Sequence, residues 1–563
     1  MALDTDVRIA RAAKMRPVAE LAREMGLPAE AVELHGHYKA KIRLEALQSL
    51  PPPRAKLVVV TAMTPTPLGE GKTVNTIGLA LGLNRLGSSA ICTTRQHSLG
   101  PVFGVKGGAA GGGRSQVLPM DDINLRLTGD IDAVAAAHNL MAALIDNHLH
   151  HGNARGLDPE AVTWRRVMDM NDRALREIRV AVGSKTERST GFDIAVASEI
   201  MAILALATTY RDLRARLGKM ILGRTRDGRP VTAEDLKAAG AMAVLVRDAL
   251  KPNLLQTIEN TPAFIHTGPF GNIAHGNSSV VADQIAARCA DYVVTESGFG
   301  ADLGFEKFVD IKCRAGGIAP SAAMVVATVR ACKLHGGDHE AKPGKPLPPE
   351  LRREDPEAVA RGACNLAHMI GIVKKAGLPA VVAINRFPDD TDREIEAVRT
   401  AARAAGADGV ELIEAYGKGG AGAVEVAKAV TKACERASSF RMFYEAGRPL
   451  REKIETIARE VYGAEGVDFS PRAAEELERY TAWGLGGLAV CMAKTQLSIS
   501  HDPKLRGRPT GFRVPVHEVR VSAGAGFVYP LLGDVMTMPG LHSAPASERM
   551  DIDDGGNLIG LSS

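Results

Sequence analysis

The sequence predicts an α/β fold: a doubly wound, mostly parallel sheet with helices on both faces. Residues 57–61 form a short, continuous run of apolar and β-branched side chains, which is typical of a strand buried on both faces. Similar runs recur at 90–93, 292–295 and 380–384. Segments with helical character separate these runs, and this alternation is expected of parallel strands joined by crossover helices.

The elements ahead of this core are expected to be helical. Residues 8–26 carry helical periodicity, and 41–50 predict a second, shorter helix. Three consecutive prolines at 51–53 end it, because proline cannot continue a helix. The strand at 57–61 then leads through a loop rich in glycine and proline into a long apolar helix at about 72–86.

The loop between this strand and this helix is close to the phosphate-binding pattern GxxxxGK[ST], with Thr66 in place of the first glycine. Gly69 and Gly71 would let backbone N–H groups curl around a phosphate at the helix N-terminus. Lys72 would reach the terminal phosphates, and Thr73 would place its hydroxyl on Mg²⁺. A glycine-rich turn without a ligand is the alternative. The candidate nucleotide-binding residues are Thr66, Pro67, Leu68, Gly69, Glu70, Gly71, Lys72 and Thr73.

A second glycine-rich segment, residues 98–114, follows the strand at 90–93. Its last part is mostly Gly and Ala and cannot build a core. A flexible linker is the alternative, although linkers usually contain serine and avoid Phe, Val and a lone Lys. We expect a loop whose backbone approaches a ligand, with Arg95, Lys106 and Arg114 supplying positive charge.

Three structural units are expected along the chain. The polar, proline-rich segment 336–358 is the best candidate boundary, and strand-like runs such as 513–516 mark the last part. We therefore expect a large P-loop domain at 1–361, a second α/β domain at 362–465 and a C-terminal α+β domain at 466–563.

Composition excludes several classes of protein. Aromatic residues are only 4%, and 69 basic against 65 acidic residues give a net charge of +4, which argues against nucleic-acid binding. No run approaches the ~18 apolar residues of a membrane span, and the N-terminal segment lacks the apolar core of a secretory signal. Seven scattered cysteines favour reduced thiols. We expect a cytoplasmic protein that acts on small molecules, without nucleic-acid or membrane partners.

Longer motifs make the chain similar to the formate–tetrahydrofolate ligases of the monofunctional bacterial type. Besides the loop at 66–73, they include SLGPVFGVKGGAAGGG at 98–113, FDIAVASEIMAIL at 192–204, KPNLLQTIENTPAF at 251–264, GPFGNIAHG at 268–276, DYVVTESGFGADLGFEKFVDIKCR at 291–314 and VVAINRFPDDT at 381–391. The resemblance runs essentially end to end. It implies ATP-dependent ligation of formate to tetrahydrofolate, giving 10-formyltetrahydrofolate through formyl phosphate, by a homotetramer.

The resemblance also implies roles for individual residues. Lys72 and the loop amides would hold the phosphates of ATP. Arg95 would bind the acyl phosphate, because a planar guanidinium can grip a carboxylate or a phosphate with two donors. Glu296 and Asp302 would assist Mg²⁺ or accept the amine proton, and the sequence does not separate these roles. Phe387, with a second aromatic residue in the 362–465 unit, would sandwich the pterin of the folate.

Several positions depart from the family pattern, and they cluster in loops expected around the ligands. The second pterin position, usually tryptophan, is Tyr416, and the loss of a carboxylate at Gln96 puts a monovalent-cation site in doubt. The substrate-pocket candidates among the changed residues are Gln96, Arg114, Arg126 and Asn277, and His97 is changed as well.

Two interpretations of these changes remain open. One is drift within a ligase that still uses formate. The other is a diverged paralogue with the same P-loop chemistry, whose pocket gained two arginines, lost a carboxylate and takes a different carboxylate or acceptor. A nucleotide switch would need a second acidic strand motif and a water-positioning residue, and the sequence shows no convincing set.

Overall fold

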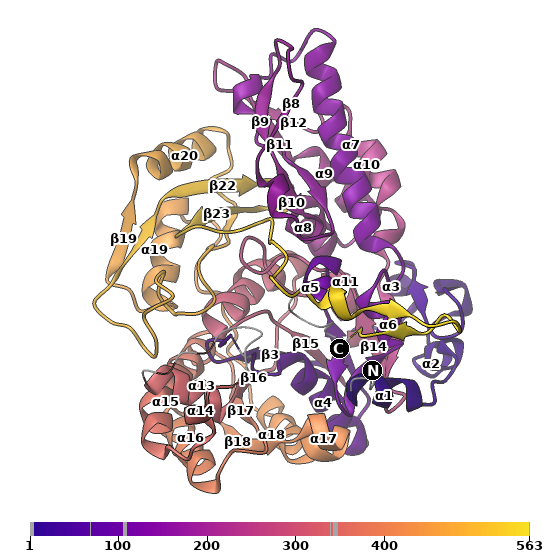
Figure 1. The fold of residues 1–563 in the computed structure, drawn as a ribbon, viewed down its shortest axis with the longest axis vertical. Helices are drawn as coiled ribbons and strands as arrows, with labels where there is room; N and C mark the ends of the chain where they lie inside the picture. The colour runs from indigo at the N-terminus through magenta and orange to yellow at the C-terminus, as the bar shows by residue number, and fades with distance from the viewer. Residues whose placement is uncertain are drawn as a thin grey trace.

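The computed structural model describes residues 5–67, 69–104, 110–337, 339, 341 and 347–561. Its main feature is a 12-stranded sheet whose principal path runs β1-β2-β13-β14-β4-β15-β3-β16-β17-β18 (Figure 1). From β14 to β18 all neighbouring strands are parallel, whereas β1, β2 and β13 add an antiparallel end. The bounds are β1 Val32–Leu34, β2 Ala40–Ile42, β13 Asn253–Thr257, β14 Pro262–Ile265, β4 Ala90–Thr94, β15 Tyr292–Glu296, β3 Lys56–Ala62, β16 Ala322–Ala327, β17 Ala380–Asn385 and β18 Gly409–Ile413. The expected α/β class is confirmed.

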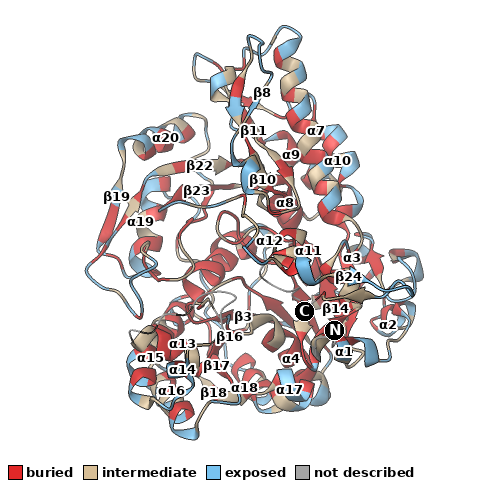
Figure 2. Ribbon diagram, viewed as in Figure 1, coloured by how far each residue is buried: buried red, intermediate tan, exposed pale blue. Residues whose placement is uncertain are grey.

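Helices cover both faces of this sheet. Alternate residues of β3 point to opposite sides, so Val58 and Val60 join one apolar cluster while Leu57 and Val59 join another. Figure 2 shows the strands as buried and the outer faces of the helices as partly exposed. The covering helices are α4 (Lys72–Arg85) and α18 (Val424–Cys434) on one face, and α11 (Val280–Cys289), α13 (Val329–Gly336), α15 (Pro356–Lys375) and α16 (Asp392–Ala404) on the other.

The predicted core elements match the structure, and two N-terminal predictions need correction. The runs at 57–61, 90–93, 292–295, 380–384 and 513–516 are strands β3, β4, β15, β17 and β21 (Arg513–Val516). The helix expected over 8–26 is two helices, α1 (Thr5–Ala12) and α2 (Val18–Glu24), because Pro17 starts a new helix. The helix expected over 41–50 is wrong in its first part: Lys41 belongs to β2, and only α3 (Ala46–Ser49) is helical.

Two further parts flank the sheet. One is an arm with α7 (Asp130–His150), α9 (Tyr210–Gly218) and α10 (Ala239–Leu245) (Figure 1, top). It also holds three two-stranded sheets: β7 (Arg166–Met168) with β10 (Phe192–Ile194), β8 (Ile178–Val180) with β9 (Arg188–Thr190), and β11 (Ile221–Arg224) with β12 (Pro230–Thr232). The other is the C-terminal part, with α19 (Leu450–Glu460) and α20 (Pro471–Ala482). One small sheet here pairs β19 (Gly466–Phe469) with β21, and another has the order β20 (Ala489–Val490), β23 (Phe527–Leu531), β22 (Glu518–Ser522).

The first and last described elements meet beside the sheet. The final hairpin, β24 (Asp551–Ile552) and β25 (Leu558–Ile559), returns to α1, where Arg11 Nη2 donates to the carbonyl of Leu558 at 2.6 Å. The boundary predicted at 361/362 falls inside α15, and β17 and β18 extend the main sheet beyond it. In the described part of the chain, no helix is long and apolar enough to cross a membrane.

Candidate functional site at the carboxyl ends of the central strands

The predicted site residues gather where the parallel strands end. Ligands of open α/β sheets bind outside the carboxyl ends of the strands, near the point where the strand order reverses. Here β3 is followed by the loop at 66–73, called the phosphate loop below, β4 by Arg95 and β16 by Thr328. Two further strands end on a polar residue, β15 on Glu296 and β17 on Asn385. Because β4, β15, β3, β16 and β17 are consecutive neighbours, these five ends form one continuous edge.

The phosphate loop has the backbone geometry that its glycines predict. Gly69 and Gly71 both have φ of 73°, the left-handed region that favours glycine. Gly71 is the N-cap of α4, and a Cβ added there would lie 2.6 Å from the side-chain amide nitrogen of Asn385. Lys72 is therefore the first residue of α4, at the end of the helix that attracts anions. Leu68 lies outside the described residues.

The carboxylate of Glu70 stabilises the phosphate loop through buried hydrogen bonds. Its Oε1 accepts hydrogen bonds from the backbone N and the Oγ1 of Thr66, both at 2.8 Å, and its Oε2 accepts one from Thr328 Oγ1 at 2.6 Å. Asn385 Nδ2 donates to the carbonyl of Glu70 at 3.1 Å. The Glu70 side chain is 3% exposed, so it points into the protein. The sequence analysis grouped Glu70 with the nucleotide-binding residues and missed Thr328 and Asn385. Their positions could have identified them, because Thr328 directly follows β16 and Asn385 is the last residue of β17.

Thr73 and Glu296 meet at the start of α4. Thr73 Oγ1 donates to Glu296 Oε1 at 3.0 Å, and Glu296 is buried at the end of β15. A hydroxyl beside a carboxylate offers the hard oxygen ligands that Mg²⁺ prefers, and Mg²⁺ usually takes few protein ligands when phosphates supply the others. The pair therefore fits a metal ion that arrives with a nucleotide.

Arg95 presents its guanidinium against the backbone of two neighbouring loops. Its Nη1 donates to the carbonyl of Pro269 at 3.3 Å, and a Cβ on Gly298 would lie 3.2 Å from its Nη2. Burial lowers the pKa of Arg95, and the charge of Glu296 opposes that shift. An arginine retains its proton at neutral pH even so, which leaves a fixed positive charge near Glu296.

A cluster of buried polar groups surrounds Arg95. Across the residues that the structure describes, its members have atoms without a hydrogen-bond partner: both amide atoms of Gln96, Oγ1 of Thr267, both ring nitrogens of His275, Oδ1 of Asn277 and Oγ of Ser297. Buried polar groups are nearly always paired, so this concentration points to a small polar ligand. Burial, with the nearby charges of Lys312 and Lys307, holds the pKa of His275 well below its usual value. His275 is therefore neutral at pH 7, and sequence reasoning did not single it out.

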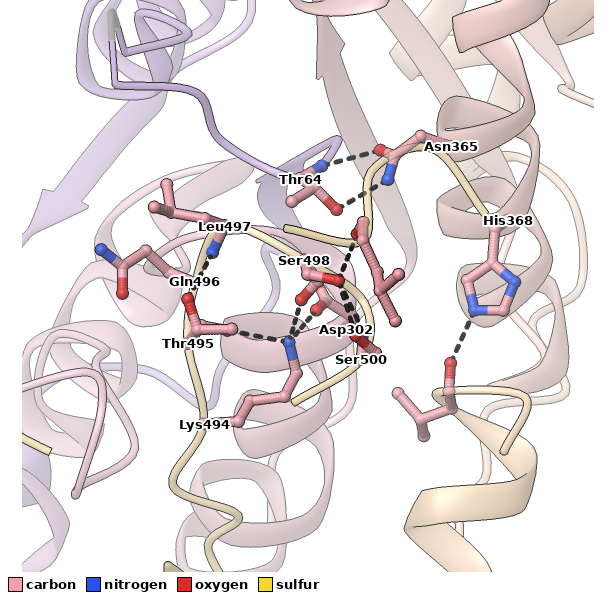
Figure 3. A network of polar contacts seen from close by, with 12 residues as sticks. Thr64, Asp302, Asn365, His368, Lys494, Thr495, Gln496, Leu497, Ser498 and Ser500 are labelled. Atoms are coloured by element: carbon pink, nitrogen blue, oxygen red, sulfur yellow. Dashed lines mark hydrogen bonds and ion pairs between the residues drawn. The ribbon is translucent and has the colours of Figure 1, made fainter. Parts of the chain in front are cut away.

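Asp302 is engaged by a lysine from the C-terminal part of the chain. Its Oδ2 lies 2.6 Å from Lys494 Nζ, and the two side chains are 1% and 0% exposed. The same Nζ donates to the carbonyls of Ser498 at 2.5 Å and Thr495 at 3.1 Å, so Lys494 lies in a cage of oxygens (Figure 3). The sequence suggested a role for Asp302 in catalysis, whereas the structure places it in a buried ion pair.

The two predicted ring platforms have different surroundings. Phe387 is half-buried, and the guanidinium carbon of Arg330 lies 3.8 Å from its ring centroid. Tyr416, on α17 (Ala415–Lys418), is 49% exposed, and its hydroxyl donates to Asp6 Oδ1 at 2.8 Å. Its carbonyl accepts a hydrogen bond from the backbone N of Arg114 at 2.7 Å.

The two additional arginines do not enlarge the charge of the buried cluster. Arg114 and Arg126 are both exposed. Arg126 Nε lies 3.9 Å from Asp132, with 75% of its side chain exposed. Lys106 lies outside the described residues. The structure thus places Gln96 and Asn277 with Arg95, and Arg114 and Arg126 on the surface.

Comparisons with known proteins agree with this geometry. The family model of formate–tetrahydrofolate ligases matches residues 4–562. A formate–tetrahydrofolate ligase of Roseiflexus sp. (strain RS-1) is 58% identical over 99% of this chain and 100% of its own length. One from Saccharopolyspora erythraea is 55% identical over the full length of both chains, and one from Chloroflexus aggregans is 53% identical over 99% of this chain and 100% of its own. With a family model across almost every residue and relatives that align end to end, the chain belongs to the formate–tetrahydrofolate ligase family.

Proposed function

We propose that this enzyme joins formate to tetrahydrofolate at the expense of ATP and releases 10-formyltetrahydrofolate, ADP and phosphate. The observation that carries the proposal is Arg95 with its cluster of unpartnered buried polar groups, one strand away from a β15 carboxylate that contacts the phosphate loop. A nucleotide site and a small-anion site that share one sheet edge suit a reaction between ATP and a carboxylate.

The chemistry explains why both sites are needed. Formate is a poor electrophile because its charge is delocalised and its leaving group would be oxide. Transfer of the γ-phosphoryl group of ATP to formate gives formyl phosphate, and the folate N10 amine then attacks the formyl carbon as phosphate leaves. The protein contributes mainly positioning and neutralisation of charge.

Each described group has a part in this scheme. The loop amides and Lys72 hold the ATP phosphates, and Arg95 binds formate and then the acyl phosphate with its two-donor edge. Thr73 and Glu296 would hold Mg²⁺, which neutralises phosphate charge when bound. Neutral His275 and the amide of Gln96 can donate hydrogen bonds without adding positive charge.

Phe387 and Tyr416 are proposed to contact the pterin, since each offers a ring face near the ends of β17 and β18. We also propose the P-loop arrangement of domains, a cytoplasmic location and a homotetramer. The diverged-paralogue alternative has no support among the relatives, which are formate–tetrahydrofolate ligases, and the two arginines that suggested it lie on the surface.

A direct assay tests the proposal. The purified chain, given formate, tetrahydrofolate and MgATP, should form 10-formyltetrahydrofolate, detected by its acid conversion to the methenyl derivative. Arg95→Lys keeps the charge but loses the flat pair of donors, and about a 100-fold lower kcat/KM is expected. Lys428→Gln on the outer surface of α18 is the matched control, because Lys428 contacts Glu425 at the surface. Bound ATP without any product, at millimolar formate, would overturn the proposal.

A further inference from the structure

Arg330 contacts the phosphate loop and the ring of Phe387 at the same time. It lies in the first turn of α13, and its Nη2 donates to the carbonyl of Gly69 at 2.6 Å. Its guanidinium carbon is 3.8 Å from the centroid of the Phe387 ring, well within the range of a cation–π contact. One planar group therefore connects the predicted nucleotide site to the predicted folate site.

The surrounding contacts make this connection stiff. Two residues before Arg330, Thr328 caps α13 and binds Glu70 of the loop at 2.6 Å. Two residues before Phe387, Asn385 donates to the Glu70 carbonyl. These hydrogen bonds and the cation–π contact link the loop, the start of α13 and the end of β17 to one another. A shift in one of the three is therefore shared by the other two.

The position of the Gly69 carbonyl depends on the conformation of the phosphate loop. Gly69 has a positive φ, and the peptide that carries this carbonyl belongs to the turn whose N–H groups would bind phosphate. Burial lowers the pKa of Arg330, while the charges of Glu70 and Asp390 oppose that shift. The guanidinium keeps its charge, as arginines in proteins do, and with it both contacts.

We propose that Arg330 is a positioning residue through which nucleotide in the phosphate loop and a flat ring on Phe387 strengthen each other's binding. Phosphate fixes the Gly69 peptide, which fixes Arg330 and holds the Phe387 ring ready for stacking. By thermodynamic reciprocity, the stacked ligand strengthens nucleotide binding by the same factor. The inference rests on the proposed function, because it takes Phe387 as part of the folate site.

Calorimetric titration of the full chain tests the coupling. Tetrahydrofolate, without formate, is titrated in the absence and in the presence of a saturating β,γ-imido analogue of ATP with Mg²⁺. In the wild type, nucleotide should lower the Kd for tetrahydrofolate by about 5- to 20-fold, within the usual range for coupled sites. Arg330→Gln should bring this factor to within about twofold of one, while each ligand alone still binds. Arg330→Lys keeps the charge beside the carbonyl but loses the flat face, so an intermediate factor is expected.

The matched control is Arg386→Gln. Arg386 is adjacent to Phe387 in sequence, but it is exposed and its charged partner is Asp392 at 3.8 Å. This variant should keep the wild-type factor. A wild-type factor of one, or an unchanged factor in Arg330→Gln, would overturn the inference and leave the proposed function intact. Failure of the wild type to bind tetrahydrofolate at all would overturn both.

Discussion

Replacing Lys494 by methionine should destabilise the protein by about 4–6 kcal/mol. The Lys494–Asp302 pair is closed at 2.6 Å and almost fully buried, and removing one partner of such a pair costs about 3–5 kcal/mol because the other charge is left uncompensated. The carbonyls of Ser498 and Thr495 would also lose their donor, which adds about 1 kcal/mol. The free energy of unfolding is measured by equilibrium urea titration, followed by circular dichroism.

A double-mutant cycle separates the ion pair from the packing of the lysine stem. Asp302→Asn in the Lys494→Met background removes the stranded charge, so the double variant should recover at least half of the lost free energy. A loss below about 1 kcal/mol for Lys494→Met, or strictly additive single effects, would refute the reasoning. The same variants test catalysis: if Asp302 only braces the fold, the folded double variant should keep kcat within about threefold of the wild type.

Three further predictions concern other parts of the site. Gly71→Ala places a Cβ 2.6 Å from the Asn385 amide nitrogen at a positive φ, so ATP affinity measured by calorimetry should fall at least about tenfold. Thr73→Ala removes a hydroxyl 3.0 Å from Glu296, so the Mg²⁺ concentration for half-maximal activity should rise several-fold at unchanged fold stability. Burial, with the charge of Asp310 second, raises the pKa of Glu306 well above its usual value, so the folded state holds a proton that the unfolded state releases at lower pH. Relative to Glu306→Gln, the wild type should therefore lose stability as pH rises above about 4.5, and urea titrations of both proteins across this range measure the difference.

The part of the fold that the sequence predicts well is the part with a strong local signal. The strands β3, β4, β15 and β17 are buried on both faces, so their apolar runs are visible without knowledge of any partner. The phosphate loop is equally local, since two glycines and a Lys-Thr pair at a helix start define it. Prediction from the sequence failed where the conformation or role of a residue depends on a partner far away along the chain. Lys41 lies in a strand and pairs with Asp130 at 2.6 Å, 89 positions away.

The same limit applies within the site. Asp302 is paired by a lysine 192 positions later, and Arg330 reaches a ring 57 positions away across β16 and β17. Neither contact leaves a pattern in the local sequence. The surface position of Arg126 could not be predicted either, because a difference from the family pattern shows that the residue type has changed but not where the side chain points.

The continuous sheet also sets a spacing. The phosphate loop follows β3 and Phe387 follows β17, with only β16 between them in the same parallel ladder. Neighbouring strands lie about 4.8 Å apart, so the ends of β3 and β17, where the proposed nucleotide and pterin subsites begin, are held roughly 10 Å from each other by backbone hydrogen bonds. A hinge between domains cannot alter that separation. The distance between these two points is therefore a property of the sheet itself, independent of how the arm and the C-terminal part are placed.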